Sequence, residues 1–318
     1  MATSRAIGFI GLGAMGYPMA ENLIKKMPKG SKIYVFDLDE DCVGKLCSAA
    51  VGKAEACANA RQVAERSEII LSMVPEGSHV REVYLNPSEG ALLADLSNKL
   101  VIDCSTIDTA TSLEIRTRIS EKYPSANFYD APVSGGVLGA QNASMTFMLG
   151  CAEDDPNFSR IHGLLSLMGG SIFACGGPTL GLTAKLCNNY CSGLIAIATA
   201  EALNIGIRAG MDPRVLAKVF STSLAQSCIN DKFNPVPRIC PDAPSSHDYK
   251  PGFKVGLMRK DFALAVDTAE RVGANLALGE KGLEVYTGAM QDERCKGLDS
   301  RVVYRYLGGD EEWEQRFA

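Results

Sequence analysis

A glycine-rich turn close to the N-terminus most constrains how this chain can fold. Residues 6–10 form a short apolar run that stops at Gly11-Leu12-Gly13-Ala14-Met15-Gly16. At this turn the apolar period changes from that of a strand to that of a helix. A GxGxxG turn between a strand and a helix is typical of dinucleotide binding, although three glycines at this spacing also occur in purely structural turns. We expect the six turn residues to contact a cofactor.

Each glycine of the turn has an expected task. Gly11 permits the tight turn, and Gly13 lets the backbone approach a pyrophosphate with no Cβ in the way. Gly16 lets the following helix pack closely on the strand. The N-terminus of that helix directs its N–H groups and the positive end of its dipole at an anion.

The residue at the end of the second strand selects the cofactor. Residues 32–36 read as a strand that ends at Asp37, about 20 residues after the last glycine. A carboxylate there accepts hydrogen bonds from a ribose diol and repels a 2′-phosphate. Residues 38–41 contain no arginine that could bind such a phosphate. The sequence therefore predicts NAD rather than NADP.

Two later strands add candidates at the same edge of the sheet. Residues 68–72 and 100–104 are apolar runs, and the carboxyl ends of parallel strands face the cofactor crevice. The residues that follow these two runs are candidates for cofactor contact: Val74, Pro75, His79 and Thr106. For His79, the local sequence alone favours a helix-start residue without a ligand.

The segment Asp130-Ala-Pro-Val-Ser-Gly-Gly136 follows a further strand at 127–129. Ser134, Gly135 and Gly136 offer a hydroxyl group and unhindered backbone N–H groups, which suit a carboxylate. A flexible loop is the alternative from spacing alone. Strands at 146–149 and 171–174 complete the first domain, and Gly176-Gly177-Pro178 marks its end. We place the domains at 1–177 and 178–318.

The second domain is predicted to be helical. A long helix runs from Pro178, preset for its first turn, to about Arg208, and its apolar middle indicates burial in a bundle or a dimer interface. Gly181, Lys185 and Asn189 share one face, where the missing side chain of Gly181 would let a ligand approach. Taken alone, a helix lysine is more often solvated than catalytic. Further helices are expected at 213–220, 252–271, 276–290 and 299–307, with a proline-rich loop at 234–251.

Composition excludes several classes of function. The net charge of −5 and the lack of a basic run argue against nucleic acid as a partner. Eleven scattered cysteines without a CxxC pair suggest free thiols in a reducing compartment. The chain has only three histidines, far apart in the sequence, so no metal site is expected. No apolar segment reaches membrane-spanning length without a polar interruption, and no membrane partner or targeting peptide is expected in this chain.

The motifs resemble those of the β-hydroxyacid dehydrogenase family over nearly the whole chain. The resemblance rests on GLGAMGYPMAENLIKK at 11–26, DAPVSGG at 130–136, MTFMLG at 145–150 and GLTAKLCNN at 181–189. Two further stretches narrow the resemblance from the whole family to one enzyme type within it: FNPVP at 233–237 and GFKVGLMRKDFALA at 252–265. The resemblance implies an N-terminal Rossmann domain, a long interdomain helix and an all-helical domain for substrate binding and oligomerisation. It also implies a homodimer or homotetramer.

The same resemblance implies roles for individual residues. Lys185 matches the catalytic lysine, Asn189 a substrate-binding amide, and Ser134-Gly135-Gly136 a carboxylate clamp. Lys260 matches a residue near substrate and nicotinamide. The remaining matches are to cofactor contacts: Gly11, Leu12, Gly13, Ala14, Met15, Gly16, Asp37, Val74, Pro75, His79, Thr106, Phe253, Lys260 and Asp261.

The activity implied is NAD-dependent oxidation of 3-hydroxyisobutyrate to methylmalonate semialdehyde in valine catabolism, with Lys185 as general acid and base. A lysine amine has an ordinary pKa near 10.4, so this role requires burial or nearby positive charge to lower it. The expected location is the mitochondrial matrix in a eukaryote and the cytoplasm otherwise.

One departure from the family pattern leaves the substrate open. Gln226 and Cys228 stand where members of this enzyme type usually carry an arginine and a tryptophan. The alternatives are a related β-hydroxyacid dehydrogenase or a reductase of glyoxylate, succinic semialdehyde or tartronate semialdehyde. A phosphogluconate dehydrogenase normally has a much longer helical domain. Relatives that act only as interaction modules have lost the lysine, which this chain keeps.

Overall fold

A computed structural model describes residues 5–317, and these form two compact units. The first unit ends at Lys185 and the second begins at Leu186, inside one long helix.

The first unit is built on a six-stranded parallel sheet. Its order is β3-β2-β1-β4-β5-β6, so the chain reverses direction across the sheet between β1 and β4. In open α/β sheets ligands bind at such a point, beyond the carboxyl ends of the strands. The strands are β1 Ala6–Ile10, β2 Lys32–Phe36, β3 Ala54–Ala56, β4 Ile69–Ser72, β5 Leu100–Asp103 and β6 Asn127–Asp130.

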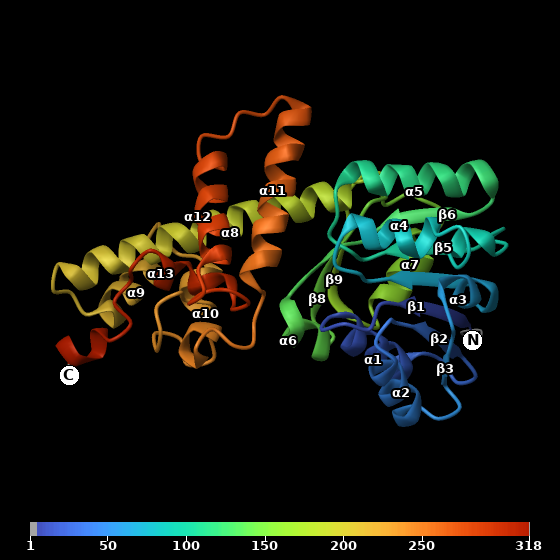
Figure 1. Ribbon diagram of the computed structural model, residues 1–318, viewed down its shortest axis with the longest axis horizontal. Coiled ribbons are helices and arrows are strands. Elements are labelled where there is room, and N and C mark those ends of the chain that lie inside the picture. The colour runs from blue at the N-terminus through green and yellow to red at the C-terminus, as the bar shows by residue number, and fades with distance from the viewer. Residues whose placement is uncertain (1–4, 318) are drawn as a thin grey trace. The chain divides into compact units, whose positions relative to one another are not determined.

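Helices cover both faces of this sheet (Figure 1). Successive strand residues point to opposite faces, so Ile69 and Leu71 belong to one apolar core and Ile70 to the other. Helices α1 and α2 pack in the first core, and α3, α4 and α5 pack in the second. Their bounds are α1 Gly16–Lys26, α2 Glu40–Ala49, α3 Ala60–Arg66, α4 Gly77–Leu85 and α5 Thr109–Lys122, with a short 3-10 turn at Ala91–Leu93.

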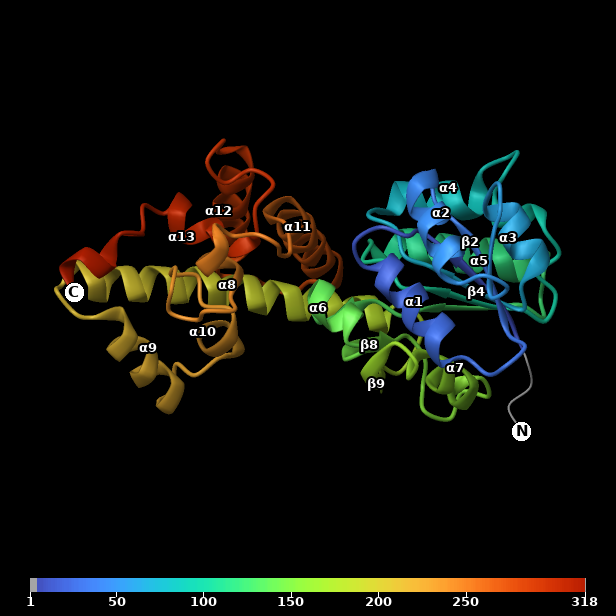
Figure 2. The same ribbon diagram turned by 90° about the horizontal axis from the view of Figure 1, so that it is seen from below.

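A second, three-stranded sheet completes the first unit. It consists of β7 Val133–Ser134, β8 Met145–Leu149 and β9 Gly169–Ala174, with β7 antiparallel to β8 and β8 parallel to β9. Helix α6, Gly136–Gln141, follows β7, and α7, Phe158–Leu165, packs beside β9 (Figure 2). The strands at 146–149 and 171–174 are confirmed, whereas α6, α7 and β7 are not foreseen from the sequence.

The second unit is helical, as expected. Its elements are the later part of α8 Leu180–Arg208, then α9 Pro213–Thr222, α10 Cys228–Lys232, α11 Val255–Val272, α12 Gly279–Gln291 and α13 Val303–Tyr306, with 3-10 turns at Pro244–His247, Ser300–Val302 and Trp313–Arg316. Phe262, Tyr286 and Trp313 are fully buried in its core. The fold is thus a Rossmann-type α/β unit followed by an all-helical unit.

Helix α8 begins later than the sequence suggests. Thr179 has φ +64°, a left-handed conformation that a right-handed helix cannot include, so Pro178 lies outside the first turn. Among the described residues, one helix is long enough and apolar enough to cross a membrane by length and composition. This helix is α8, with a mean hydropathy of 1.4 in its most apolar stretch. Leu182, Leu186 and Leu203 of this helix are buried within the protein, so we interpret α8 as a core helix.

Candidate active site

The glycine turn has the geometry that a dinucleotide requires. Gly11 has φ +95°, and a Cβ on it would overlap the carbonyl oxygen of Met73. A Cβ on Gly13 would meet nothing within 4 Å, so the backbone there is open to a ligand. At Gly16 the first obstacle is the carbonyl oxygen of Gly11, with the Phe9 ring next at 3.2 Å. The last glycine therefore closes the turn on itself as well as packing the helix on the strand.

Asp37 is fixed at the end of β2 by two backbone groups. Its Oδ2 accepts a hydrogen bond of 2.5 Å from the Leu12 N–H, and its Oδ1 accepts one of 2.8 Å from the Asp39 N–H. The carboxylate therefore braces the glycine turn from the neighbouring strand. Leu38 beside it is 87% exposed, a position that sequence reasoning does not single out. The open backbone at Gly13 and the placed carboxylate of Asp37 together fit NAD.

A buried hydrogen-bond network holds the loops after β4 and β5. Asp103 accepts hydrogen bonds from the hydroxyl groups of Ser72 at 2.7 Å and Ser105 at 2.6 Å. The Ser105 oxygen in turn accepts the Val74 N–H at 2.9 Å. Since the Ser72 proton is given to Asp103, the Tyr84 hydroxyl donates to Ser72 at 2.8 Å. Burial raises the pKa of Asp103 to about 6.

This network supports the predicted cofactor residues without being predicted itself. It fixes the backbone at Val74 and at Ser105, next to Thr106. A polar residue at the end of an apolar strand is the signal that could have identified Asp103. Pro75 is exposed, and His79 is exposed in the first turn of α4, where its N–H donates to the Glu76 carbonyl at 3.1 Å. The cofactor role of His79 stays a prediction.

Ser134, Gly135 and Gly136 form a strand-to-helix junction between β7 and α6. Gly135 has φ +130° and Gly136 has φ +63°, and both are exposed. Ser134 is the last residue of β7 and Gly136 is the first of α6, so only Gly135 lies between the two elements and the segment is not an irregular loop. Asn22 of α1 secures the far end of α6: its side-chain N–H₂ donates to the carbonyl oxygens of residues 140 and 141 at 2.7 and 3.2 Å.

Lys185 and Asn189 lie on successive turns of α8, and both are buried. Their i, i+4 spacing puts them on one face of the helix. The expectation that Gly181 leaves room for a ligand is wrong. A Cβ on Gly181 would overlap the carbonyl oxygen of Met148 and lie 2.8 Å from Asp130 Oδ2. Gly181 is a backbone contact between α8 and the three-stranded sheet.

In the second unit a buried carboxylate joins two of the predicted site residues. Asp261 Oδ2 accepts a hydrogen bond of 2.5 Å from the side-chain amide of Asn189. The Lys260 amine lies 3.1 Å from Asp261 Oδ1. Asp261 is only 2% exposed, so its contacts orient the amide and the amine. Phe253, also predicted to contact the cofactor, donates its backbone N–H to Asp299 Oδ2 at 2.7 Å.

The two departures from the family pattern are both exposed. Gln226 donates its side-chain N–H to Asp231 Oδ2 at 2.7 Å, which anchors it to α10. Cys228 is the first residue of α10.

All eleven cysteines are free, and burial raises the pKa of the Cys151 thiol to about 11. Within residues 5–317, no group of three or more His, Cys, Asp or Glu side chains could hold a metal ion.

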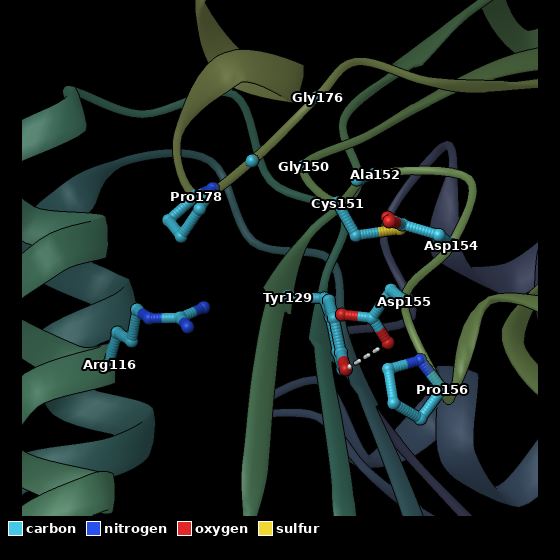
Figure 3. A pocket seen from close by; sticks show the side chains of 11 residues that line it. Arg116, Tyr129, Gly150, Cys151, Ala152, Asp154, Asp155, Pro156, Gly176 and Pro178 are labelled. Carbon is cyan, nitrogen blue, oxygen red and sulfur yellow. Dashed lines mark hydrogen bonds between the residues drawn. The ribbon is translucent and has the colours of Figure 1, made fainter.

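A cavity of about 280 Å³ in the first unit lies apart from these residues (Figure 3). Arg116 and Tyr129 line it, and the Tyr129 hydroxyl donates to Asp155 Oδ1 at 2.9 Å. Its wall also includes Gly150 and the segment 176–178 that leads into α8. None of the predicted cofactor, substrate or catalytic residues is among those that line it.

Two family models match almost the entire chain. Residues 6–177 match the NAD-binding domain of 6-phosphogluconate dehydrogenase. Residues 180–307 match the NAD-binding domain of NADP-dependent 3-hydroxyisobutyrate dehydrogenase.

Whole proteins are similar at nearly full length. A probable mitochondrial 3-hydroxyisobutyrate dehydrogenase of Dictyostelium discoideum is 39% identical over 96% of this chain and 92% of its own length. The 3-hydroxyisobutyrate dehydrogenase of Pseudomonas aeruginosa is 38% identical over 96% of this chain and 99% of its own length. The human mitochondrial enzyme is 37% identical over 98% of this chain and 89% of its own length. A Mycobacterium tuberculosis structure, titled as this dehydrogenase with L-serine, gives a TM-score of 0.84 at 31% identity, covering 96% of this chain and 99% of that one.

Proposed function

Since the chain belongs to the 3-hydroxyisobutyrate dehydrogenase family and is an NAD-dependent hydroxyacid dehydrogenase, we propose that it oxidises 3-hydroxyisobutyrate to methylmalonate semialdehyde. This reaction belongs to the catabolism of valine. The support is near full-length similarity to relatives of that name from a bacterium, an amoeba and mammals.

We propose Lys185 as the group that takes the proton from the substrate hydroxyl. NAD, when bound, supplies the acceptor for the hydride that leaves the carbinol carbon. Lys185 accepts the hydroxyl proton and then donates a hydrogen bond to the oxygen as it becomes a carbonyl. In the reverse direction the same amine returns the proton.

The observation that carries this proposal is the burial of the lysine. Lys185 is 8% exposed, and lysines are almost never this buried unless they are paired or have a function. Asn189, one turn further along the same face, is 6% exposed. An amine and an amide that are both withheld from water on one helix face suit a small polar substrate.

The substrate carboxylate is proposed to bind the Ser134 hydroxyl and the N–H groups of the junction at Gly135 and Gly136. Their lack of side chains leaves these N–H groups accessible, and both glycines are exposed. Asn189 is proposed to hold the hydroxyl oxygen, oriented by Asp261. Lys260 is proposed to bring positive charge to the same chemistry, and its pair with Asp261 fixes its amine.

Replacing Lys185 tests the mechanism. General acid–base catalysis contributes typically 10²- to 10⁴-fold, so Lys185→Ala should lower kcat by about that factor while the Kd for NAD stays near that of the wild type. Lys45→Ala, at an exposed position of α2, is the control and should keep full turnover. A Lys185→Ala enzyme with near wild-type kcat would refute the assignment.

The same assay identifies the substrate. The purified protein is offered 3-hydroxyisobutyrate, glycolate, glycerate and 4-hydroxybutyrate, each with NAD and with NADP. We expect the highest kcat/KM with 3-hydroxyisobutyrate and NAD. A preference for one of the other three acids would identify the corresponding semialdehyde or glyoxylate reductase instead.

We further propose that the protein works as a homo-oligomer, in the mitochondrial matrix of a eukaryotic cell or in the cytoplasm of a bacterium. The eukaryotic relatives carry the word mitochondrial in their names, and a bacterial relative is similar over its full length. The oligomer is supported by exposed apolar side chains near the end of α8, on α9 and just after α9: Ile205, Val215, Val219 and Leu224.

A further inference from the structure

The first turn of α8 is held by a buried carboxylate from another part of the chain. Asp130, at the end of β6, is 2% exposed. Its Oδ1 accepts the Thr179 N–H at 2.8 Å, and its Oδ2 accepts the Leu182 N–H at 2.9 Å. The first N–H groups of a helix have no partner inside it, so this carboxylate satisfies the start of α8.

Two glycines make room for this carboxylate. A Cβ on Gly150, just after β8, would overlap the carboxyl group of Asp130. A Cβ on Gly181 would overlap the Met148 carbonyl oxygen and lie 2.9 Å from the Gly150 nitrogen. The Gly150 N–H also donates to the Asp130 carbonyl at 2.8 Å. Helix, strand and carboxylate are therefore in direct contact, and α8 cannot slide without breaking this packing.

Thr179 shows that the contact is strong enough to hold an unfavourable conformation. A β-branched residue at φ +64° is a genuine outlier, and such a conformation persists only where the surrounding structure holds it. The hydrogen bond from its N–H to Asp130 helps to keep it there.

We propose that Asp130 is a positioning residue, which sets where the Lys185 amine stands relative to the segment that binds the substrate carboxylate. Lys185 follows Leu182 by less than one turn of α8, so the bond to Leu182 fixes both the rotation and the height of the helix at the lysine. The segment that begins at Asp130 also continues directly to Ser134. One carboxylate thus connects the acid–base group to the proposed carboxylate clamp.

This inference rests on the proposed role of Lys185. A misplacement of about 1 Å in a reacting group can lower a rate about 100-fold. Cofactor binding should be unaffected, because the glycine turn and Asp37 make no hydrogen bond to Asp130 among the described residues. Asp130 therefore acts on kcat, through Lys185.

Asp130→Asn tests this, because an amide keeps the size but has one acceptor oxygen for two N–H donors. With 3-hydroxyisobutyrate and NAD we expect kcat to fall about 10- to 100-fold, with the Kd for NAD within about twofold of the wild type. The double variant Asp130→Asn/Lys185→Ala should be no slower than Lys185→Ala alone, since positioning has no effect once the amine is gone. A merely structural role would slow both backgrounds equally.

Asp103→Asn is the matched control. It removes another buried strand-end carboxylate, whose partners are Ser72 and Ser105 and not α8. It should weaken NAD binding, and its effect on kcat should add to that of Lys185→Ala. If Asp130→Asn does not fold, Gly181→Ala displaces the start of α8 with Asp130 intact and should lower kcat in the same way.

The outcomes separate the two proposals. Loss of activity in Lys185→Ala with full activity in Asp130→Asn or Gly181→Ala would overturn the positioning role alone. Full activity in Lys185→Ala would overturn the proposed mechanism, whatever the other variants do.

Discussion

Two aspartates at the ends of neighbouring strands show how much depends on single buried side chains. Asp103 ends β5 and Asp130 ends β6, and burial raises the pKa of both carboxyl groups. Asp103 is surrounded by hydroxyl groups that hold the cofactor loops. Asp130 is bound by backbone N–H groups that hold a helix. The same residue type therefore supports two different parts of the site.

The raised pKa of Asp103 predicts a pH dependence of stability. Because the folded-state pKa is about 6, above the ordinary value of 3.8, the folded protein binds this proton more tightly than the unfolded chain does. The stabilisation from this proton is fully present below about pH 4 and is lost as the pH rises through 6. Asp103→Asn cannot titrate. The unfolding free energy of the wild type should therefore fall relative to that of the variant as the pH rises from 4.5 to 7.5.

Urea unfolding at several pH values measures this difference. Asp95→Asn is the control: the folded-state pKa of the exposed Asp95 carboxyl group lies below its ordinary value of 3.8, so the difference between this variant and the wild type should stay nearly constant from pH 4.5 to 7.5. Parallel curves for wild type and Asp103→Asn would mean that Asp103 does not titrate in this range.

The sequence identifies the residues whose role follows from local spacing. The glycine turn and Asp37 occur at fixed distances within one strand–helix–strand unit, so both could be predicted. The hydrogen-bond partners of Asn22, Asp103 and Asp130 could not be predicted, because these partners lie far away in the chain. Gly181 was misinterpreted for the same reason. Nothing in its neighbours along the helix shows that a strand carbonyl lies against it.

At the scale of the elements, length separates those that can be predicted from those that cannot. The strands predicted at 6–10 and 32–36 agree with β1 and β2 residue for residue. Helices α6 and α10 have six and five residues, and β7 has two. Such short elements carry too few residues for a period, and they are stabilised mainly by contacts with other parts of the chain.

Asn22 predicts a coupling between two helices. Asn22→Leu keeps the size but leaves the carbonyl oxygens at the end of α6 without their buried donor, at a cost of about 1–3 kcal/mol. We expect the unfolding free energy to fall by about that amount. Because α6 begins at Gly136, in the proposed carboxylate clamp, the KM for 3-hydroxyisobutyrate should rise.

Thermal unfolding and steady-state kinetics measure both effects. Asn127→Leu, at the exposed first position of β6, is the control and should leave the KM unchanged. A destabilised Asn22→Leu enzyme with an unchanged KM for the acid would show that α6 does not position the clamp.

For the whole molecule, the alternation of strands and helices followed by helices alone is enough to predict the fold class. The limits of the domains remain a prediction: the sequence places a boundary at 177/178, and the compact units divide after Lys185, inside α8. A second sheet, separate from the first, also requires knowledge of which strands pair. The short β7 supplies one edge of that sheet, and it has no recognisable pattern of its own.

The proposed oligomer can be tested on α9. Val215 and Val219 are 50% and 44% exposed and lie one turn apart on this helix. Charged groups are strongly disfavoured at a buried apolar interface, so Val215→Asp/Val219→Asp should dissociate the oligomer. Light scattering after size-exclusion chromatography measures the mass. Val51→Asp, at an 86% exposed position of the first unit, should keep the wild-type mass. An oligomer that survives the double substitution would place the interface elsewhere.

The tight packing around Gly181 limits how such an enzyme can change its preference among acids. With no space for even a methyl group at the first turn of α8, the backbone there cannot shift to suit a longer or shorter molecule. Divergence toward new substrates must then proceed by exchange of side chains around a constant framework. An engineer seeking altered selectivity should accordingly randomise those side chains and leave the glycine untouched.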